Sequence, residues 1–234
     1  MKNRLLTTPF LRRAVKNRSV RTVELLIEWG ADVNAMVTDL SLLQLACSEQ
    51  STDIVRVLLQ NGANVNLPWP IDGSTPLHMA GCTEFRSGLI RTTTQPLGHK
   101  TCGSCAAIVL EHGAEVNVGD DHGATPLHHA AFYDCQPLTT LLINSGANIN
   151  SRNSGKEIPL HKAASYSSLD VIPILINAGS NIEAMDLRGA TPLHRTAAAA
   201  NELSAASFKM LLGYGANLDA PDNRGRTPLH WMRE

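Results

Sequence analysis

The chain has 234 residues, with 20 Lys and Arg against 21 Asp and Glu, so its formal net charge is -1. Only 18% of the residues are charged and 43% are apolar, which argues against a disordered chain. The absence of a basic excess argues against a nucleic-acid-binding protein, because such proteins must neutralise phosphates. The longest apolar run, Cys105 to Leu110, is far shorter than the ~20 residues that cross a bilayer.

The cysteines and the N-terminal segment bear on the compartment. Five cysteines stand at positions 47, 82, 102, 105 and 135. An odd number at irregular spacing, in a chain long enough to build an ordinary core, is not typical of a disulfide framework. Met1 to Val15 has no apolar segment of the kind found in secretory signals. These features predict an intracellular protein, cytoplasmic or nuclear, in a reducing compartment.

A tetrapeptide that recurs along the chain marks where each predicted repeat begins. Its clear copies are Thr75–His78, Thr125–His128, Ile158–His161, Thr191–His194 and Thr227–His230, and two weaker copies are Pro9–Arg12 and Ser41–Gln44. Repeats therefore start near 9, 41, 75, 125, 158, 191 and 227, and the underlying period is 33. A second marker, Gly-Ala-Asp/Asn-Val-Asn and its variants, recurs in step from Gly30, Gly62, Gly113, Gly146, Gly179 and Gly215. Two markers in one register indicate a repeat architecture.

The fourth repeat illustrates the elements expected in each unit. Thr125 is predicted to cap a first helix, and Pro126 suits the first helical position because it needs no hydrogen-bond partner. Apolar residues at 138 and 141–143 mark the buried face of a second helix, which Gly146 ends in the left-handed conformation. Neither helix is long enough to be stable alone, so each repeat is expected to bury its faces on its neighbours.

The 33-residue period, the Thr-Pro-Leu-His tetrapeptide and the Gly-Ala-Asp/Asn-Val-Asn box resemble the ankyrin repeat family over essentially the whole chain. The resemblance implies an all-α solenoid, with a helix-turn-helix and a β-hairpin loop in each repeat, stacked into a right-handed curved array. We expect a single domain over residues 1–234, with six full repeats and a seventh that is cut short after His230. We therefore also expect a truncated chain or a domain excised from a longer protein.

The third repeat departs from the period. About 17 extra residues, Glu84 to Lys100, fall between its two helices and are expected to form a surface loop. Near them, Cys82, His99, Cys102 and Cys105 offer a possible tetrahedral zinc set. Cys105 aligns with core positions of other repeats, so a buried thiol is the favoured alternative, and a Cys102/Cys105 redox pair is a third. We expect no metal and no cofactor.

Histidines and glycines do not indicate catalysis. Five of the nine histidines are the fourth residue of the tetrapeptide, where the resemblance implies hydrogen bonds within the turn and to adjacent backbone. Helix ends and hairpins account for most glycines, and no nucleophile with a base, phosphate-binding loop or pair of carboxylates stands out. We therefore predict that the chain is not an enzyme.

The resemblance implies binding of a partner protein by the concave face, which hairpin tips and the exposed sides of the first helices form. The residues predicted to bind the partner are Trp69, Met79, His129, Phe132, Tyr133, Lys162, Tyr166 and Arg195. Aromatic residues and Arg dominate interface hot spots, and Lys162 and Arg195 would steer an acidic partner. The alternative is that Phe132 and Tyr133 pack on the neighbouring hairpin.

The predicted function is that of a monomeric scaffold or adaptor that binds another protein. A different possibility is the substrate-recognition module of a ubiquitin ligase or signalling enzyme whose other domain lies outside this chain. A weaker alternative is a zinc-stapled binding module.

The resemblance also implies a modification site. The asparaginyl hydroxylase that modifies many ankyrin proteins favours a Leu eight residues before the target and an acidic residue two before it. Among the asparagines that end the second marker, only Asn34, with Leu26 and Asp32, has both. Asn34 is therefore the predicted site.

Overall fold

A computed structural model describes residues 4–37, 40–80, 103–199 and 203–232. The chain divides into two compact units, an N-terminal unit, Met1–Glu115, and a C-terminal unit, Val116–Glu234. The insertion expected at Glu84 to Lys100 lies outside the described residues. Whether the two units form one continuous domain stays a prediction.

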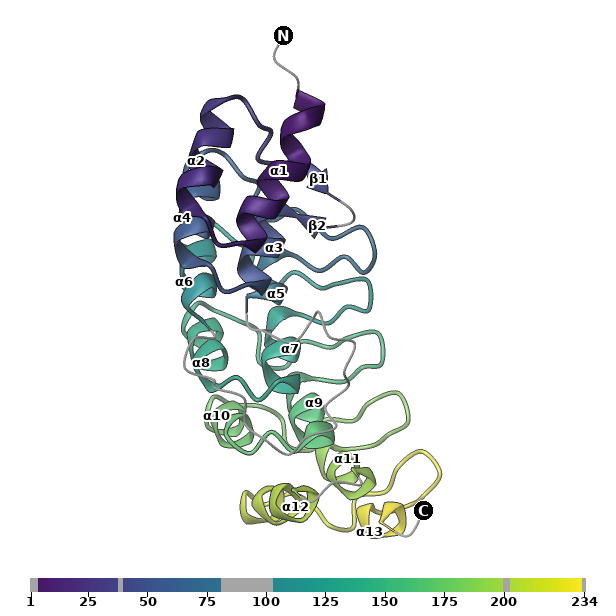
Figure 1. Cartoon of the computed structure of the whole chain (residues 1–234). Helices are drawn as coiled ribbons and strands as arrows, with labels where there is room; N and C mark the ends of the chain where they lie inside the picture. Colours follow the sequence, from purple (N-terminus) through teal and green to yellow (C-terminus); the bar gives the residue numbers. More distant parts are fainter. Residues whose placement is uncertain (1–3, 38–39, 81–102, 200–202, 233–234) are drawn as a thin grey trace. The chain divides into compact units, whose positions relative to one another are not determined.

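The N-terminal unit contains three pairs of helices. They are α1 (Arg4–Lys16), α2 (Val20–Glu28), α3 (Leu42–Ser48), α4 (Thr52–Gln60), α5 (Pro76–Met79) and α6 (Ser104–Glu111). Within this unit α1, α3 and α5 pack in one row, and α2, α4 and α6 pack in a second (Figure 1). Two short strands, β1 (Met36–Val37) and β2 (Leu40–Ser41), pair antiparallel in the first connecting loop.

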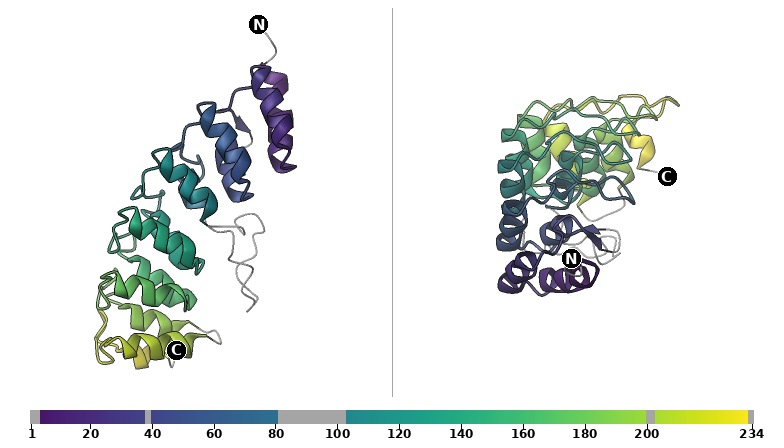
Figure 2. Two further views of the ribbon diagram at one scale, coloured as in Figure 1. Left: turned by 90° about the vertical axis from the view of Figure 1, so that its left-hand side faces the viewer. Right: turned by 90° about the horizontal axis from the view of Figure 1, so that it is seen from above.

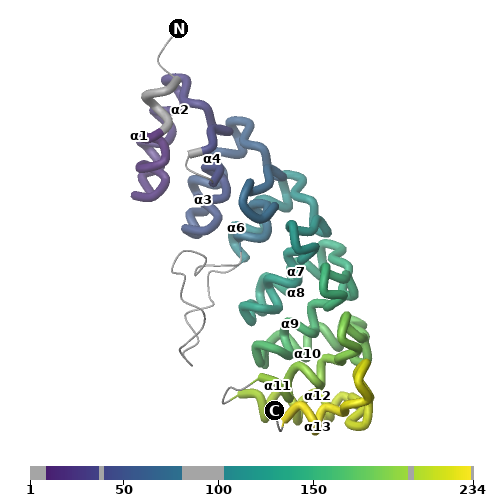
Figure 3. Tube along the Cα trace, turned by 90° about the vertical axis from the view of Figure 1, so that its right-hand side faces the viewer, coloured from purple at the N-terminus to yellow at the C-terminus, as the bar shows by residue number. Residues whose placement is uncertain are grey.

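The C-terminal unit repeats the same pattern. It contains α7 (Pro126–Phe132), α8 (Gln136–Asn144), α9 (Pro159–Tyr166), α10 (Val171–Asn177), α11 (Pro192–Ala198), α12 (Ser204–Gly213) and α13 (Pro228–Trp231). The first helices α7, α9, α11 and α13 pack one on the next, and the two helices of each full repeat lie side by side (Figure 2). Figure 3 views the loops between repeats from the side on which they project. The predicted helical solenoid is confirmed.

Small and aliphatic side chains fill the core of the C-terminal unit. On α7, Leu127 and Ala131 are fully buried, and on α8 the same holds for Leu142. Leu141 and Ile143, which the sequence placed on the same face as Leu142, are only half-buried. The buried stripe of α8 is therefore narrower than predicted, because a short helix presents only one side to its neighbours.

The tetrapeptide histidine joins successive repeats. In the fourth repeat, His128 Nδ1 accepts a hydrogen bond from the backbone N–H of Thr125 at 3.0 Å, and its Nε2 donates to the Glu157 carbonyl of the next repeat at 3.0 Å. The corresponding histidines of α9 and α11, His161 and His194, likewise reach backbone carbonyls of the following repeat at 3.0 Å. These contacts confirm the structural role predicted for the tetrapeptide histidines.

Stability of the C-terminal unit is expected to fall in mild acid. Burial lowers the pKa of His128 to about 4, although the hydrogen bond to the Glu157 carbonyl opposes the shift. The unfolded chain takes up the proton below pH ~6.5 and the folded chain does not, so folding weakens as the pH falls from ~6.5 toward ~4, by about 3 kcal/mol for this histidine. Urea unfolding midpoints at several pH values would measure the effect.

A matched variant isolates this histidine. In the second repeat Gln44 stands in the same position, where it accepts from the Ser41 N–H at 2.9 Å and donates to the Ser74 carbonyl at 2.8 Å. His128→Gln should therefore keep both contacts and reduce the pH dependence, leaving the part that comes from His161, whose pKa burial also lowers, whereas His122→Gln, at an exposed position, should not change it. An unchanged pH profile in His128→Gln would contradict the assignment.

Candidate protein-binding surface of the C-terminal unit

One polar side chain fixes the turn of each hairpin. Asp186 Oδ1 accepts from the backbone N–H groups of Arg188 at 2.7 Å and Ala190 at 2.9 Å. Asp120, Asn153 and Asp222 occupy the corresponding positions and accept two backbone bonds of 2.8 to 2.9 Å in the same way. A side chain that replaces missing backbone partners in a turn is the usual role of Asp and Asn at such positions.

The other carboxylate oxygen of each hairpin Asp holds a first-helix residue nine positions later. Asp120 Oδ2 lies 2.9 Å from His129 Nε2, Asp186 Oδ2 lies 2.5 Å from Arg195, and Asp222 Oδ2 accepts from Trp231 Nε1 at 3.0 Å. In the fifth repeat, where the hairpin residue is Asn153, Glu157 binds the Lys162 amine at 2.5 Å instead. We call His129, Lys162, Arg195 and Trp231 the contact row.

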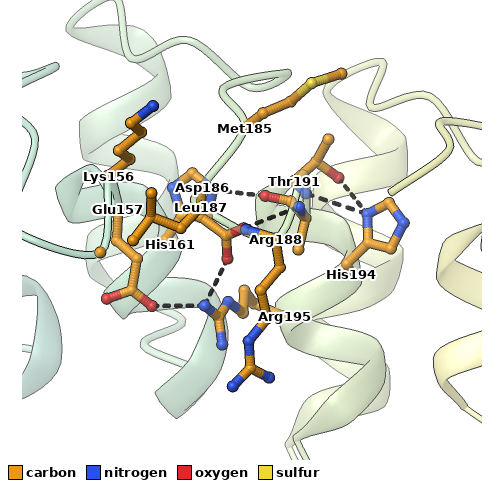
Figure 4. Close-up of polar contacts among 12 residues, drawn as sticks. Lys156, Glu157, His161, Met185, Asp186, Leu187, Arg188, Thr191, His194 and Arg195 are labelled. Atoms are coloured by element: carbon orange, nitrogen blue, oxygen red, sulfur yellow. Dashed lines mark hydrogen bonds and ion pairs between the residues drawn. The ribbon is translucent and has the colours of Figure 1, made fainter. Parts of the chain in front are cut away.

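Glu157 and Asp186 together neutralise the two cations of the contact row. Both carboxylates lie against the Arg195 guanidinium, with Glu157 at 2.9 Å (Figure 4). The side chains of Lys162 and Arg195 are only 27% and 22% exposed. Two acids therefore balance two bases, and the prediction that Lys162 and Arg195 steer an acidic partner is wrong. A partly buried cation needs a partner within the fold, and here the hairpins provide it.

Hydrogen bonds keep the hairpin carboxylates ionised. Burial alone would raise the pKa of Asp120, but bonds from His129 and from backbone N–H groups outweigh it and lower the pKa to about 2. Burial also opposes ionisation of Glu157, whose pKa is nevertheless lowered, chiefly by hydrogen bonds from Lys162 and Asn153. Both carboxylates are therefore charged near neutral pH.

An aromatic cluster lies beside the contact row, at the ends of α7 and α9. The Phe132 ring centroid is 4.0 Å from that of Tyr166 and 4.7 Å from that of Tyr133. Phe132 and Tyr133 are half-buried, whereas Tyr166 is 36% exposed. Phe132 and Tyr133 are therefore partly covered by the surrounding side chains. Tyr166 offers the most accessible ring of the cluster.

Two of the predicted binding residues belong to the N-terminal unit. Trp69 is half-buried in a hairpin. Its backbone N–H donates to the Ser74 carbonyl at 2.8 Å, and its backbone carbonyl accepts from the Gly73 N–H at 2.8 Å. Met79, at the end of α5, is 1% exposed. Because its side chain lies in the core, the prediction that Met79 contacts a partner is wrong.

The acidic partners of the contact row were not among the residues predicted from the sequence. No catalytic or metal-binding pattern in the sequence includes Glu157, Asp186 or Asp222. The sequence feature that could have identified the aspartates is their spacing: Asp120, Asp186 and Asp222 each stand five residues before the Thr of a tetrapeptide. A charged residue at a fixed distance from a turn marker indicates a side chain that completes the turn.

The cysteines differ from one another. Cys47 and Cys105 are free and buried, and burial raises the pKa of Cys105 to about 11 despite the opposing charge of Arg18. Both occupy the core positions predicted for them. Cys135 is disulfide-bonded, which differs from the expectation of reduced cysteines. Of the suggested zinc set, Cys82, His99 and Cys102 lie outside the described residues.

Asn34 is exposed, and its amide joins two hairpins. Its Nδ2 donates to the Gly62 carbonyl at 3.0 Å, and its Oδ1 accepts from the Asn64 N–H at 2.7 Å. Asn66 makes the corresponding pair of contacts with the next repeat of the N-terminal unit. Asn34 thus belongs to a series of asparagines that join successive hairpins by hydrogen bonds. Its modification stays a prediction.

Models of ankyrin repeats match residues 11–91, 127–176 and 160–232. The chain belongs to the ankyrin repeat family. Proteins of this family bind other proteins, and ankyrin repeat domains are generally not enzymes. Among the described residues, no helix has the length and apolar character needed to cross a membrane.

Individual ankyrin repeat proteins resemble parts of this chain. Ankyrin repeat protein FPV031 of fowlpox virus is 31% identical over 136 residues, which is 57% of this chain and 35% of that protein. Human ankyrin repeat and SOCS box protein 16 is 37% identical over 107 residues, 45% of this chain and 20% of that protein. The crystal structure of the human ASB11 ankyrin repeat domain matches with a TM-score of 0.77 and 25% identity, covering 94% of this chain and 90% of that one. The chain spans about a third or less of the length of the two curated relatives, the fowlpox virus protein and the SOCS box protein.

Proposed function

We propose that this ankyrin repeat protein is a scaffold or adaptor that binds a partner protein through the contact row and the neighbouring hairpins of the C-terminal unit, and that it performs no catalysis. The observation that carries the proposal is the arrangement of the contact row. His129, Lys162 and Arg195 are partly exposed, one per repeat, and a hairpin carboxylate holds each in place; Trp231, only 8% exposed, is held in the same way at the end of the row. Side chains that are fixed before binding lose little entropy when a partner docks.

The aromatic cluster supports an apolar anchor beside this row. Tyr166 is exposed while its ring rests on Phe132, so it offers a rigid surface for contact. Tyrosine is among the residues that contribute most to protein interfaces. We infer that the partner places an apolar side chain against Tyr166 and polar groups along the contact row.

Replacing Tyr133 and Tyr166 together by Ala is expected to weaken partner binding by about 2 kcal/mol or more. Loss of the ring contacts to Phe132 should lower the free energy of unfolding by only about 1 kcal/mol. The partner would first be captured from a lysate of the source organism with the wild-type chain and identified by mass spectrometry. Its affinity for each variant would then be measured by titration.

Lys209→Ala provides the control, because Lys209 is exposed on α12, away from the contact row. It should leave both binding and the melting temperature unchanged. Equal affinity of the double Ala variant and the wild type would exclude the aromatic cluster from the interface. Unfolding of the double variant would instead assign both tyrosines to the core.

A second candidate is a substrate-recognition module of a ubiquitin ligase or signalling enzyme. The similarity to ankyrin repeat and SOCS box protein 16 and to the ASB11 ankyrin repeat domain supports it. The discriminating observation is the full-length transcript together with the proteins that co-purify with its product. Ligase subunits or a catalytic domain would favour the module, and their absence would favour a simple adaptor.

We propose a monomeric protein of the cytoplasm or nucleus that binds neither nucleic acid nor metal and does not insert into membranes. The near-zero net charge and the two free buried thiols support this assignment. The disulfide at Cys135 is the observation against a reducing compartment. Thiol labelling of protein purified without reductant, and light scattering for the mass, would test both points.

A further inference from the structure

The last two hairpins of the C-terminal unit enclose a basic pocket that the contact row does not explain. Its volume is about 670 Å³, and it is lined by Arg188, Ala198, Asp222, Asn223, Arg224, Arg226 and Trp231. Trp231 belongs to the contact row, so the pocket continues the proposed binding surface toward the hairpin tips. Three arginines and one aspartate are the charged residues in its lining.

Two hydrogen bonds from Asn223 hold the two hairpins at a fixed separation. The Asn223 N–H donates to the Arg188 carbonyl at 2.9 Å, and Asn223 Nδ2 donates to the Leu187 carbonyl at 3.0 Å. Gly189 has a φ of +73°, and a Cβ there would lie 2.5 Å from Asn223 Oδ1. Only glycine permits this approach, and Arg188 and Arg224 therefore stand on neighbouring tips whose spacing the fold determines.

The charges of the pocket do not cancel. Arg226 pairs with Asp222 at 2.9 Å, and the Trp231 indole also donates to this carboxylate. Burial alone would raise the pKa of Asp222, but hydrogen bonds from Arg226, Arg224 and Trp231 hold it below its ordinary range. Asp222 and Arg226 therefore offset each other.

Arg188 and Arg224 are exposed, and within the described part of the chain neither guanidinium has a hydrogen bond or ion pair. The pocket thus retains two positive charges. This contrasts with Lys162 and Arg195, whose charges Glu157 and Asp186 neutralise. In the described part of the C-terminal unit, Lys162 and Arg195 on the first helices are paired, whereas Arg188 and Arg224 at the hairpin tips are available to an incoming group.

We propose that this pocket binds a carboxylate-rich acidic segment of the partner protein, an inference that rests on the proposed protein-binding function and specifies the chemistry of the partner. A guanidinium presents two parallel N–H groups that match the two oxygens of a carboxylate. Arg188 and Arg224 can each bind one carboxylate, so two acidic side chains of one segment fit the pair. The indole of Trp231, with Arg226 packed 5.0 Å above it, gives the pocket a rigid wall.

The test uses the full chain and a defined probe, a fluorescein-labelled hexaglutamate peptide with blocked ends, followed by fluorescence anisotropy. Hexaglutamine with the same label is the uncharged control. At about 20 mM salt, where exposed charges are weakly screened, the glutamate peptide should bind and the glutamine peptide should not. Raising the salt to about 500 mM should weaken binding at least tenfold, since the two arginines are solvent-accessible.

Variants locate the binding. Arg188→Gln and Arg224→Gln should each lower the affinity for hexaglutamate by about tenfold, because each removes a charge-assisted contact. Lys209→Gln removes one positive charge at an exposed site outside the pocket lining and should have no effect on the affinity. The melting temperature should be unchanged in all three variants, since the side chains are exposed.

Equal affinities of the wild type and the Arg188→Gln/Arg224→Gln double variant would overturn the proposal, as would equal binding of hexaglutamine. Binding of a phosphoserine peptide without binding of hexaglutamate would overturn the assignment to carboxylates. The proposed function is tested separately. If the natural partner still requires Tyr133 and Tyr166 while hexaglutamate fails to bind, the interaction surface stands and only the acidic chemistry is wrong.

Discussion

Replacing Leu142 by Ala is expected to lower the free energy of unfolding of the C-terminal unit by about 2 to 5 kcal/mol. The side chain is fully buried on α8, where α7 and α10 pack, so its removal leaves a cavity that the short helices cannot close. Urea unfolding followed by circular dichroism measures the loss. Hydrogen exchange should rise more in α7 to α10 than in α12 and α13, because a solenoid repeat contacts only its neighbours.

Leu141→Ala is the matched control, because Leu141 precedes Leu142 on the same helix and is only half-buried. It should cost clearly less than Leu142→Ala. Equal losses at the two positions would mean that the burial pattern of α8 is wrong. A uniform rise in exchange over the whole chain would contradict the local character of the repeat contacts.

Replacing Asp186 by Ala is expected to lower the free energy of unfolding by about 3 kcal/mol. The carboxylate is 1% exposed, binds Arg195 and accepts from the backbone N–H groups of Arg188 and Ala190. Its removal leaves two backbone donors and part of a guanidinium without acceptors. Unfolding midpoints in urea at neutral pH measure the loss.

Asp186→Asn separates the two contributions. Asn153, at the same position of the preceding hairpin, accepts the two backbone bonds with its amide oxygen at 2.9 Å. Asp186→Asn should therefore keep the turn, lose only the ion pair and cost about 1 kcal/mol. If the Asn variant were as unstable as the Ala variant, the ion pair with Arg195 would dominate and the turn bonds would be minor.

The fold and its repeating units can be predicted from the amino-acid sequence alone. The tetrapeptide fixed where first helices begin, because Thr, Pro and His each meet a backbone requirement within one turn, as His128 does with Thr125. Local hydrogen-bond needs of this kind are readable at short range. The same register placed Cys105 and Cys47 in the core, and both are buried.

The charge of the surface, in contrast, depends on contacts between repeats that the sequence does not show. Lys162 and Arg195 looked like free cations because their partners, Glu157 and Asp186, come from hairpins, and Glu157 lies 38 positions before Arg195 in the chain. The charge that a partner meets depends on which side chains the hairpins bring within hydrogen-bond distance, and that distance is set by repeat stacking. For the same reason, Arg188 and Arg224 became the exposed cations of a pocket only when Asn223 joined their two hairpins.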